Sequence, residues 1–460
     1  MNISVQTFLR NKKVISSISS QVITLGVSIL MTVGVTRFIS VENYGYWQLF
    51  IFYTGYVGLA HFGICDGLYL LYGGKQLDDL NKREVKGIFI LFFILQFISA
   101  IIIVIYGFLF ESNLTRQLIL LLTAFVLLIA NSQMFFGYIL LGTNNIVEYS
   151  KSIFIEKLLL LAFIISSIFL KVISLESLLL SFCVSKSLSL LYLLSYGKLF
   201  LSEKVEYNKG LLLNLIREGG ILMLSNIVST LILGVGRYFI DKAWSIETFG
   251  KISLAVSLVY FVLVILSQLS FVLFPYLRNN NANQQVVIFK KLNYYLPLAL
   301  KICILLYFPI AYLLEILLPS YHESIKYLIL LLPLCLFDGK MQIVYTSYFK
   351  NLLLQRSLLV INIVCLIVSF VVSLLGAYVF KSIDLILTGV VCSIVLRAIL
   401  SEQILLRKYQ IKDFSTTLID VMFSLSIILF YYFQFNIYIL IVISITLILI
   451  NLRFRKISFI

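Results

Sequence analysis

The sequence predicts an all-α membrane protein that crosses the lipid bilayer about fourteen times. Of the 460 residues, 61% are hydrophobic and 12% are charged, whereas a soluble domain is nearer half apolar and a quarter charged. Apolar stretches long enough to span a bilayer recur along the whole chain. The polar segments between them are short. Irregular backbone is not tolerated in lipid, so we expect these segments to be loops at the membrane surfaces.

Each apolar stretch has roughly the 20 residues that a helix needs to cross the hydrocarbon core. The first one follows Arg10, Lys12 and Lys13 but is too long for a cleaved signal peptide, so we expect it to remain a span. The predicted spans are residues 14–39, 46–72, 87–110, 117–141, 147–170, 174–196, 212–236, 249–275, 294–318, 324–349, 356–379, 384–405, 414–433 and 437–452.

Lysine and arginine are distributed unevenly between the loops on the two sides. With the amino terminus inside, the inside segments hold 23 of these residues and the outside segments hold 8. The positive-inside rule therefore predicts that both termini are cytoplasmic and that the number of spans is even. The net charge of +15 is explained by these loops, so we expect contact with membrane lipids and no contact with nucleic acid.

The chain contains an internal repeat at an offset of 205 residues. Residues 20–24 match residues 225–229, and residues 37–45 match residues 242–250 in the same register. Six predicted helices separate the two copies, so both copies enter the membrane from the same side, as in transporters built from parallel repeats. We therefore predict a six-helix bundle at 1–210, a second six-helix bundle at 211–412 and two additional helices at 413–460.

The first helix of each predicted bundle carries a stripe of polar residues at helical spacing. The stripe of the first helix includes Gln21, Thr24 and Ser28, and the related helix carries Asn226 and Ser229. Such stripes can be close-packed helix contacts or interhelical hydrogen bonds. Their repeat-related positions favour a shared polar cavity between the two bundles.

Charged residues deep in a span are informative, because each costs several kcal/mol unless it is paired or solvated. Some of them are expected to form structural ion pairs, and Lys301 is shallow enough for its ammonium to reach the membrane surface. Arg217 lies near a cytoplasmic end. The charges that we place inside the predicted spans are Asp66, Glu156, Lys157, Lys186, Glu218, Lys301, Asp338, Lys340 and Arg397.

The sequence contains no motif for a nucleotide, a metal or a catalytic nucleophile, so we predict no cofactor, no metal site and no catalytic residues. The two histidines, His61 and His322, are too far apart in sequence to suggest a metal site. A membrane-embedded glycan polymerase would need a larger extracytoplasmic loop than any predicted here. These observations favour a transporter over an enzyme.

The chain resembles the polysaccharide-biosynthesis (O-antigen repeat-unit) flippases of the multidrug/oligosaccharidyl-lipid/polysaccharide (MOP) exporter superfamily. The resemblance covers most of the chain and rests on the fourteen spans, the parallel repeat and short motifs. Residues 37–45 look like the family's first extracytoplasmic turn, and residues 236–240 look like its Asp-Arg-hydrophobic stretch. Gly236 stands at the position of the family's Asp, which removes that carboxylate unless Asp241 substitutes for it.

The resemblance implies a function in the bacterial cytoplasmic (inner) membrane. The protein would flip an undecaprenyl-diphosphate-linked oligosaccharide, an O-antigen or capsule repeat unit, from the inner to the outer leaflet by alternating access. Contact with polysaccharide polymerase machinery is also implied. The diphosphate is anionic, so cationic side chains are suitable partners. The predicted cationic lining is Lys157, Lys186, Arg217, Lys301, Lys340 and Arg397.

Without a nucleotide site, the energy for transport would come from an ion gradient, with H+ or Na+ as the counter-ion. Asp66, Glu218 and Asp338 are the candidate coupling carboxylates. Three alternatives remain open at this point. They are a drug or metabolite antiporter, a flippase for lipid-linked peptidoglycan precursors, and a membrane-embedded glycan polymerase.

Overall fold

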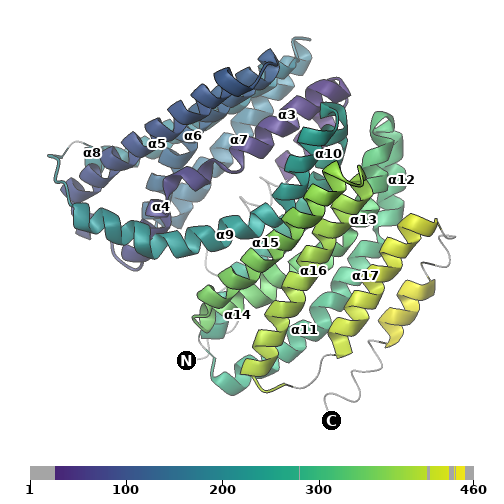
Figure 1. Cartoon of the computed structure of the whole chain (residues 1–460). Helices are drawn as coiled ribbons and strands as arrows, with labels where there is room; N and C mark the ends of the chain where they lie inside the picture. The colour runs from purple at the N-terminus through teal and green to yellow at the C-terminus, as the bar shows by residue number, and fades with distance from the viewer. Residues whose placement is uncertain are drawn as a thin grey trace. The chain divides into compact units, whose positions relative to one another are not determined.

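The computed structural model describes residues 26–201, 203–278, 280–411, 415–434, 440 and 442–450. Within these ranges every regular element is a helix, as the sequence predicts (Figure 1). Two compact units divide the chain, Met1–Ile227 and Val228–Ile460. The division falls inside α9 (Lys209–Ala243), which contributes residues to both units. The predicted three-part division at residues 210 and 412 stays a prediction.

The described part of the first unit is a bundle of long apolar helices. It begins with a short apolar helix, Gly26–Val35. The elements that follow are α3 (Val41–Thr54), η1 (Val57–His61), α4 (Ile64–Leu71), η2 (Leu77–Asp79), α5 (Lys82–Phe110), α6 (Leu114–Gly142), α7 (Ile146–Phe169), α8 (Leu175–Leu201) and the first part of α9. Polar side chains start several of these helices. Asn81 accepts a hydrogen bond from the Arg83 backbone N–H, and Asn113 accepts one from the Arg116 backbone N–H.

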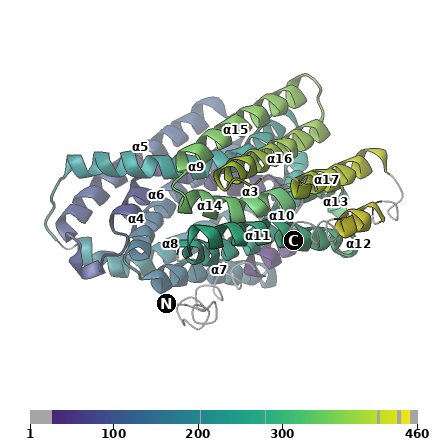
Figure 2. The same ribbon diagram turned by 90° about the horizontal axis from the view of Figure 1, so that it is seen from below.

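The second unit has a similar sequence of elements. After α9 they are α10 (Ile246–Arg278), α11 (Ala282–Leu305), α12 (Tyr307–Leu317), η3 (Pro319–Tyr321), α13 (His322–Lys340), the π-helical turn η4 (Met341–Tyr345), α14 (Thr346–Asn351), α15 (Gln355–Tyr378), α16 (Ile383–Lys408) and α17 (Ser415–Phe433). Residues 442–450 are helical as well. Figures 1 and 2 show α15 and α16 running side by side in this unit.

One helix lies at the centre of each unit. In the first unit, α6 packs against α3, α4, α5, α7 and α8, and in the second unit, α13 packs against α10, α11, α12, α16 and α17. The two central helices occupy equivalent positions of the sequence repeat, since residues 114–142 shifted by 205 become 319–347. Side chains on α6 and α13 therefore face several neighbouring helices at once, which favours them as positions for a functional site.

The second predicted span is broken in the structure. The segments Val41–His61 and Ile64–Leu71 are bent by 59° at Gly63, which has φ +81°. Side-chain amides satisfy two carbonyl groups at the break. Gln96 donates to the Ala60 carbonyl at 2.7 Å, and Asn131 donates to the Val57 carbonyl at 2.9 Å. These hydrogen bonds supply the partners that non-helical backbone needs at membrane depth.

A proline explains the end of α11. Pro309 has no N–H to donate to the Leu305 carbonyl, and the helix is interrupted at Leu306 before α12 starts. The interrupted segment Ala282–Leu317 is still long and apolar enough to cross a membrane as one span.

Eleven helices of the described residues are long and apolar enough to span a membrane, and the bent pair at Gly63 makes a twelfth span if it is counted as one. The first and last predicted spans, 14–39 and 437–452, lie partly outside the described residues. The count of fourteen therefore stays a prediction, whereas the positions of the twelve middle spans agree with the structure to within a few residues at most ends.

Candidate functional site

A polar cluster in the first unit joins three neighbouring helices. Glu156 on α7 accepts hydrogen bonds from Lys186 on α8 at 3.0 Å and from Gln133 on α6 at 3.2 Å. The Lys157 ammonium lies 3.5 Å from the same carboxylate. Gln133 also donates to Ser189, which in turn donates to the Ser152 carbonyl. The central helix therefore holds the carboxylate in place, and the carboxylate holds two lysines. We call Gln133, Glu156, Lys157 and Lys186 the first node.

The first node carries more positive than negative charge. Two ammonium groups share one carboxylate, which leaves a net charge of +1. The Lys157 and Lys186 side chains are 27% and 16% exposed, whereas Glu156 is 6% exposed. The two lysine side chains are therefore partly exposed in this chain, whereas the carboxylate is buried. Both lysines were expected from the sequence to meet an anionic group.

A second cluster in the other unit is fully buried and electrically balanced. Lys301 on α11 lies 2.7 Å from Asp420 on α17. Lys340 on α13 lies 3.0 Å from Asp420 and 3.4 Å from Glu402 on α16. Two cations therefore face two carboxylates, and all four side chains are at most 1% exposed. Asn293 on α11 donates to Glu402 at 2.5 Å and accepts a hydrogen bond from the Tyr345 hydroxyl, which extends the cluster.

This placement differs from the expected role of Lys301 and Lys340. The sequence analysis put both lysines on the lining of a cavity, but in this structure neither ammonium is accessible. The physical reason is that Asp420 and Glu402 neutralise them inside the helix bundle. Sequence reasoning missed both carboxylates, although each lies within a predicted span, 414–433 or 384–405, and such in-span carboxylates are the signal that would have found them.

Arg397 and Asp338 form a further pair in the second unit. The Arg397 guanidinium on α16 donates to the Asp338 carboxylate on α13 at 3.3 Å, and Gln342 on the π-helical turn donates to the other carboxylate oxygen at 2.8 Å. The two side chains are 6% and 15% exposed. We call Asp338, Gln342 and Arg397 the second node. The structure thus brings together a predicted cation and a predicted coupling carboxylate.

The remaining predicted residues lie apart from these clusters. Asp66 is buried beside the break in the second span, with its carboxylate 3.6 Å from the His61 imidazole. Arg217, Glu218 and Asn226 are exposed on α9, and Ser28 and Ser229 are half-buried. Gln21 and Thr24 lie outside the described residues, so their stripe stays a prediction.

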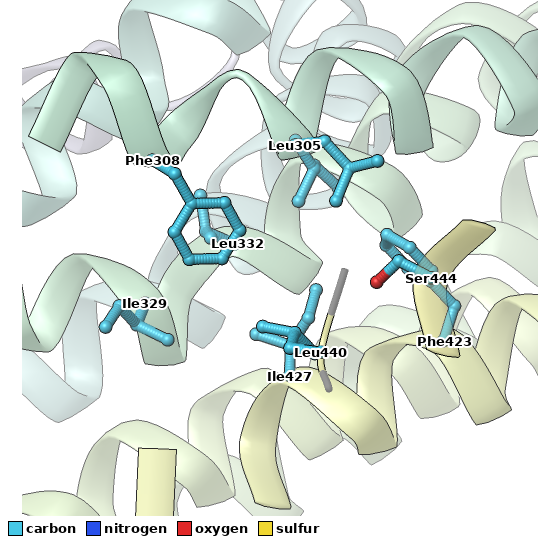
Figure 3. A pocket seen from close by; sticks show the side chains of 9 residues that line it. Leu305, Phe308, Ile329, Leu332, Phe423, Ile427, Leu440 and Ser444 are labelled. Atoms are coloured by element: carbon cyan, nitrogen blue, oxygen red, sulfur yellow. The ribbon is translucent and has the colours of Figure 1, made fainter. Parts of the chain in front are cut away.

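A small recess in the second unit has a mainly apolar lining that contains no residue of the second node. Figure 3 shows side chains from α11, α12, α13 and α17 around it, together with Leu440 and with Ser444, the polar member of the lining. Apolar side chains of this kind can contact an apolar ligand but supply no hydrogen bond or counter-charge to a charged group. The described residues contain no group of three potential metal ligands.

The sequence matches no protein-family model and no curated protein sequence. Solved structures do match. An inward-facing multidrug resistance MATE family transporter of the MOP superfamily has a TM-score of 0.66 and 13% identity, over 88% of this chain and 100% of that one. The lipid II flippase MurJ in an inward closed conformation has a TM-score of 0.57 and 16% identity, over 96% and 99%. The eukaryotic MATE transporter AtDTX14 has a TM-score of 0.59 and 14% identity, over 86% and 96%.

The chain has the fold of the MOP-superfamily transporters. The matches cover 86% or more of this chain and 96% or more of each of the other chains, although the sequence identities are 16% or less. Together with the eleven or more apolar helices, they indicate a multi-pass membrane protein.

Proposed function

We propose that this protein is a flippase that moves an undecaprenyl-diphosphate-linked oligosaccharide across the cytoplasmic membrane by ion-coupled alternating access. The observation that carries the proposal is the net positive charge of the first node, where Lys157 and Lys186 share the single carboxylate of Glu156. A diphosphate entering the membrane must replace its water with cationic donors, and an accessible, incompletely neutralised lysine pair supplies them.

The fold supports the same proposal at a coarser level. It is shared by drug transporters and by a flippase whose name identifies lipid II as its cargo. A carrier of this kind needs no catalytic residue, because translocation makes and breaks no covalent bond. Both termini are then cytoplasmic, in agreement with the distribution of Lys and Arg in the loops.

The second candidate is an antiporter for drugs or metabolites, which is favoured by the higher TM-score of the MATE transporter. The charge of the first node argues against a cationic drug, because its two ammonium groups would repel such a substrate. A flippase for peptidoglycan precursors would also carry a diphosphate, so it differs from our proposal in the glycan.

Transport by purified protein in liposomes tests the proposal. A fluorescent prenyl-diphosphate-linked oligosaccharide would be placed in both leaflets, and an impermeant quencher would report how fast the inner pool becomes accessible. We expect the wild type to translocate this lipid, and we expect K157A and K186A to slow it by about tenfold, the effect of losing a charge-assisted hydrogen bond.

K251A is the matched control, since Lys251 pairs with Glu323 at 3.1 Å elsewhere in the chain. Its translocation rate should equal that of the wild type. No translocation by wild-type protein, combined with uptake of a cationic dye against a proton or sodium gradient, would replace the flippase by the antiporter. Faster translocation of a peptidoglycan precursor than of the oligosaccharide would assign the protein to the cell-wall pathway.

A further inference from the structure

The Arg397 guanidinium in the second node is incompletely satisfied. Among the residues that the structure describes, its hydrogen-bonding partner is Asp338, through one nitrogen at 3.3 Å. The Nε atom is buried and makes no hydrogen bond within the described residues. An arginine has five N–H donors in a planar fork that matches phosphate, and leaving a buried donor unpaired has a cost in free energy. The side chain therefore has unused capacity for an anion with several oxygens.

The two nodes occupy related places in the two units. Gln133 on α6 and Asp338 on α13 are separated by 205 residues, the offset of the sequence repeat. In each unit the cation comes from the equivalent later helix, Lys186 on α8 and Arg397 on α16. Each node contains one side-chain amide, one carboxylate and at least one cation. Both nodes therefore use the central helix and the equivalent later helix, although the carboxylate lies on α7 in the first node and on α13 in the second.

The charge of the nodes is where they differ. In the first node two lysines face one carboxylate, so the net charge is +1, whereas in the second node Arg397 and Asp338 cancel each other. Asp338 is also the more exposed partner of its pair, at 15% against 6%. The carboxylate is therefore the less buried half of this ion pair.

We propose that Arg397 is a second diphosphate-binding residue and that Asp338 occupies the position of the anion when no substrate is bound. This inference rests on the proposed function and adds a second residue that binds the diphosphate of the substrate. Gln342 steadies the Asp338 carboxylate from the adjacent π-helical turn, a local irregularity of the kind that recurs at functional sites. Incoming diphosphate displaces Asp338 and takes the donors of Arg397, including the buried Nε–H.

The test measures anion binding directly, without transport. The purified full-length protein in nanodiscs of phosphatidylcholine would be titrated with inorganic pyrophosphate by calorimetry. D338N removes the internal competitor and gives the second node a charge of +1, like the first, so we expect pyrophosphate to bind about tenfold more tightly. D338S is a second, smaller replacement and should act in the same direction. Adding R397Q to D338N should abolish the gain, whereas adding R397K should keep part of it, because lysine lacks the planar fork.

D384N is the matched control. Asp384 lies on the same helix as Arg397 and accepts a hydrogen bond from Tyr431 at 2.7 Å, so this variant changes the total charge equally without touching the node. Unchanged pyrophosphate affinity in both D338N and D338S, with the proteins folded, would overturn the inference. An equal gain in D384N would do the same, because it would trace the effect to overall charge.

The result also separates this inference from the proposed function. If K157A and K186A slow translocation while D338N leaves pyrophosphate binding unchanged, the proposal of a flippase is supported and the proposed role of Arg397 is wrong. Repeating the titration of D338N in phosphatidylglycerol nanodiscs distinguishes a substrate diphosphate from a lipid headgroup. If D338N binds pyrophosphate as tightly in these nanodiscs, the result supports a diphosphate as the ligand of Arg397. If the tenfold gain in pyrophosphate affinity is lost, Arg397 binds anionic lipid headgroups and the inference is overturned.

Discussion

The buried charges of this protein divide into those that are neutralised inside a unit and those that are not. Lys301 and Lys340 lie at the centre of the second unit, and Asp420 contacts both of them. Removing an ion from water into such a place costs several kcal/mol, which only a well-placed counter-charge offsets. Asp420 belongs to α17, so this helix supplies the counter-charge of Lys301, which would otherwise be buried without one. At this scale, charge balance together with full burial marks the cluster of Lys301 and Lys340 as structural.

The charge balance between Lys301 and Asp420 can be tested by removing the two charges singly and together. D420N should lower the free energy of unfolding by roughly 3–5 kcal/mol, because it leaves Lys301 buried without a counter-charge. K301M combined with D420N should recover most of this loss, since Lys340 keeps its pair with Glu402 at 3.4 Å. Equilibrium unfolding in mixed micelles measures both. A double variant as unstable as the sum of the two single variants would contradict the assignment. K251M, at a more exposed pair, should cost less than about 1 kcal/mol.

Two elements of the first unit approach so closely that side chains are excluded between them. Gly63 and Gly67 flank the start of α4, and the backbone of α9 at Leu215 and Gly219 lies directly against them. Small residues allow helices in a membrane to come this near. This backbone contact packs the broken second span against α9. The position of the break therefore depends on the absence of a side chain at Gly63, Gly67 and Gly219.

Two neighbouring glycines of α9 provide a matched comparison. A Cβ atom on Gly219 would collide with the backbone of Gly63 and Gly67, whereas one on Gly220 would meet nothing within 4 Å. We expect G219A to destabilise the protein by roughly 1–3 kcal/mol, since backbone must move to accommodate the methyl group. G220A should leave stability unchanged or raise it by up to about 1 kcal/mol through helix propensity. Thermal unfolding in detergent compares the two, and equal losses would refute the close contact.

For the whole molecule, the distribution of positive charge predicts which loops lie on which side of the membrane. The segment between α4 and α5 contains Lys75, and α5 itself starts with Lys82 and Arg83, whereas the segment between α7 and α8 contains Lys171 alone among basic residues. Because basic loops are retained in the cytoplasm, the first of these segments is expected inside and the second outside.

Single cysteines test this orientation in a variant whose six native cysteines have been replaced. D78C and V172C place the thiol at exposed positions of the two loops. In intact cells, a membrane-impermeant maleimide should label V172C and leave D78C unlabelled, and after lysis it should label both. Labelling of D78C in intact cells would invert the topology and with it the direction of the proposed transport.

The sequence alone determined the properties that depend on local composition. A bilayer requires about 20 apolar residues for each crossing, so hydropathy was sufficient to predict the all-helical fold and the middle spans. The cost of burying charge also pointed to Lys157, Lys186, Asp338 and Arg397 as important. Glycine and proline positions were readable too, but the break at Gly63 was not predicted, because its stability comes from Gln96 and Asn131 on other helices.

Only the tertiary structure decided which of these charges are available to a ligand. Lys301 and Asp420 are 119 residues apart in sequence, and Lys340 and Glu402 are 62 apart, so no local pattern relates them. Helix packing brings them together and neutralises them, while the same packing leaves the first node with one positive charge in excess. The physical reason is that hydropathy acts on each helix separately, whereas electrostatic balance depends on which helices become neighbours.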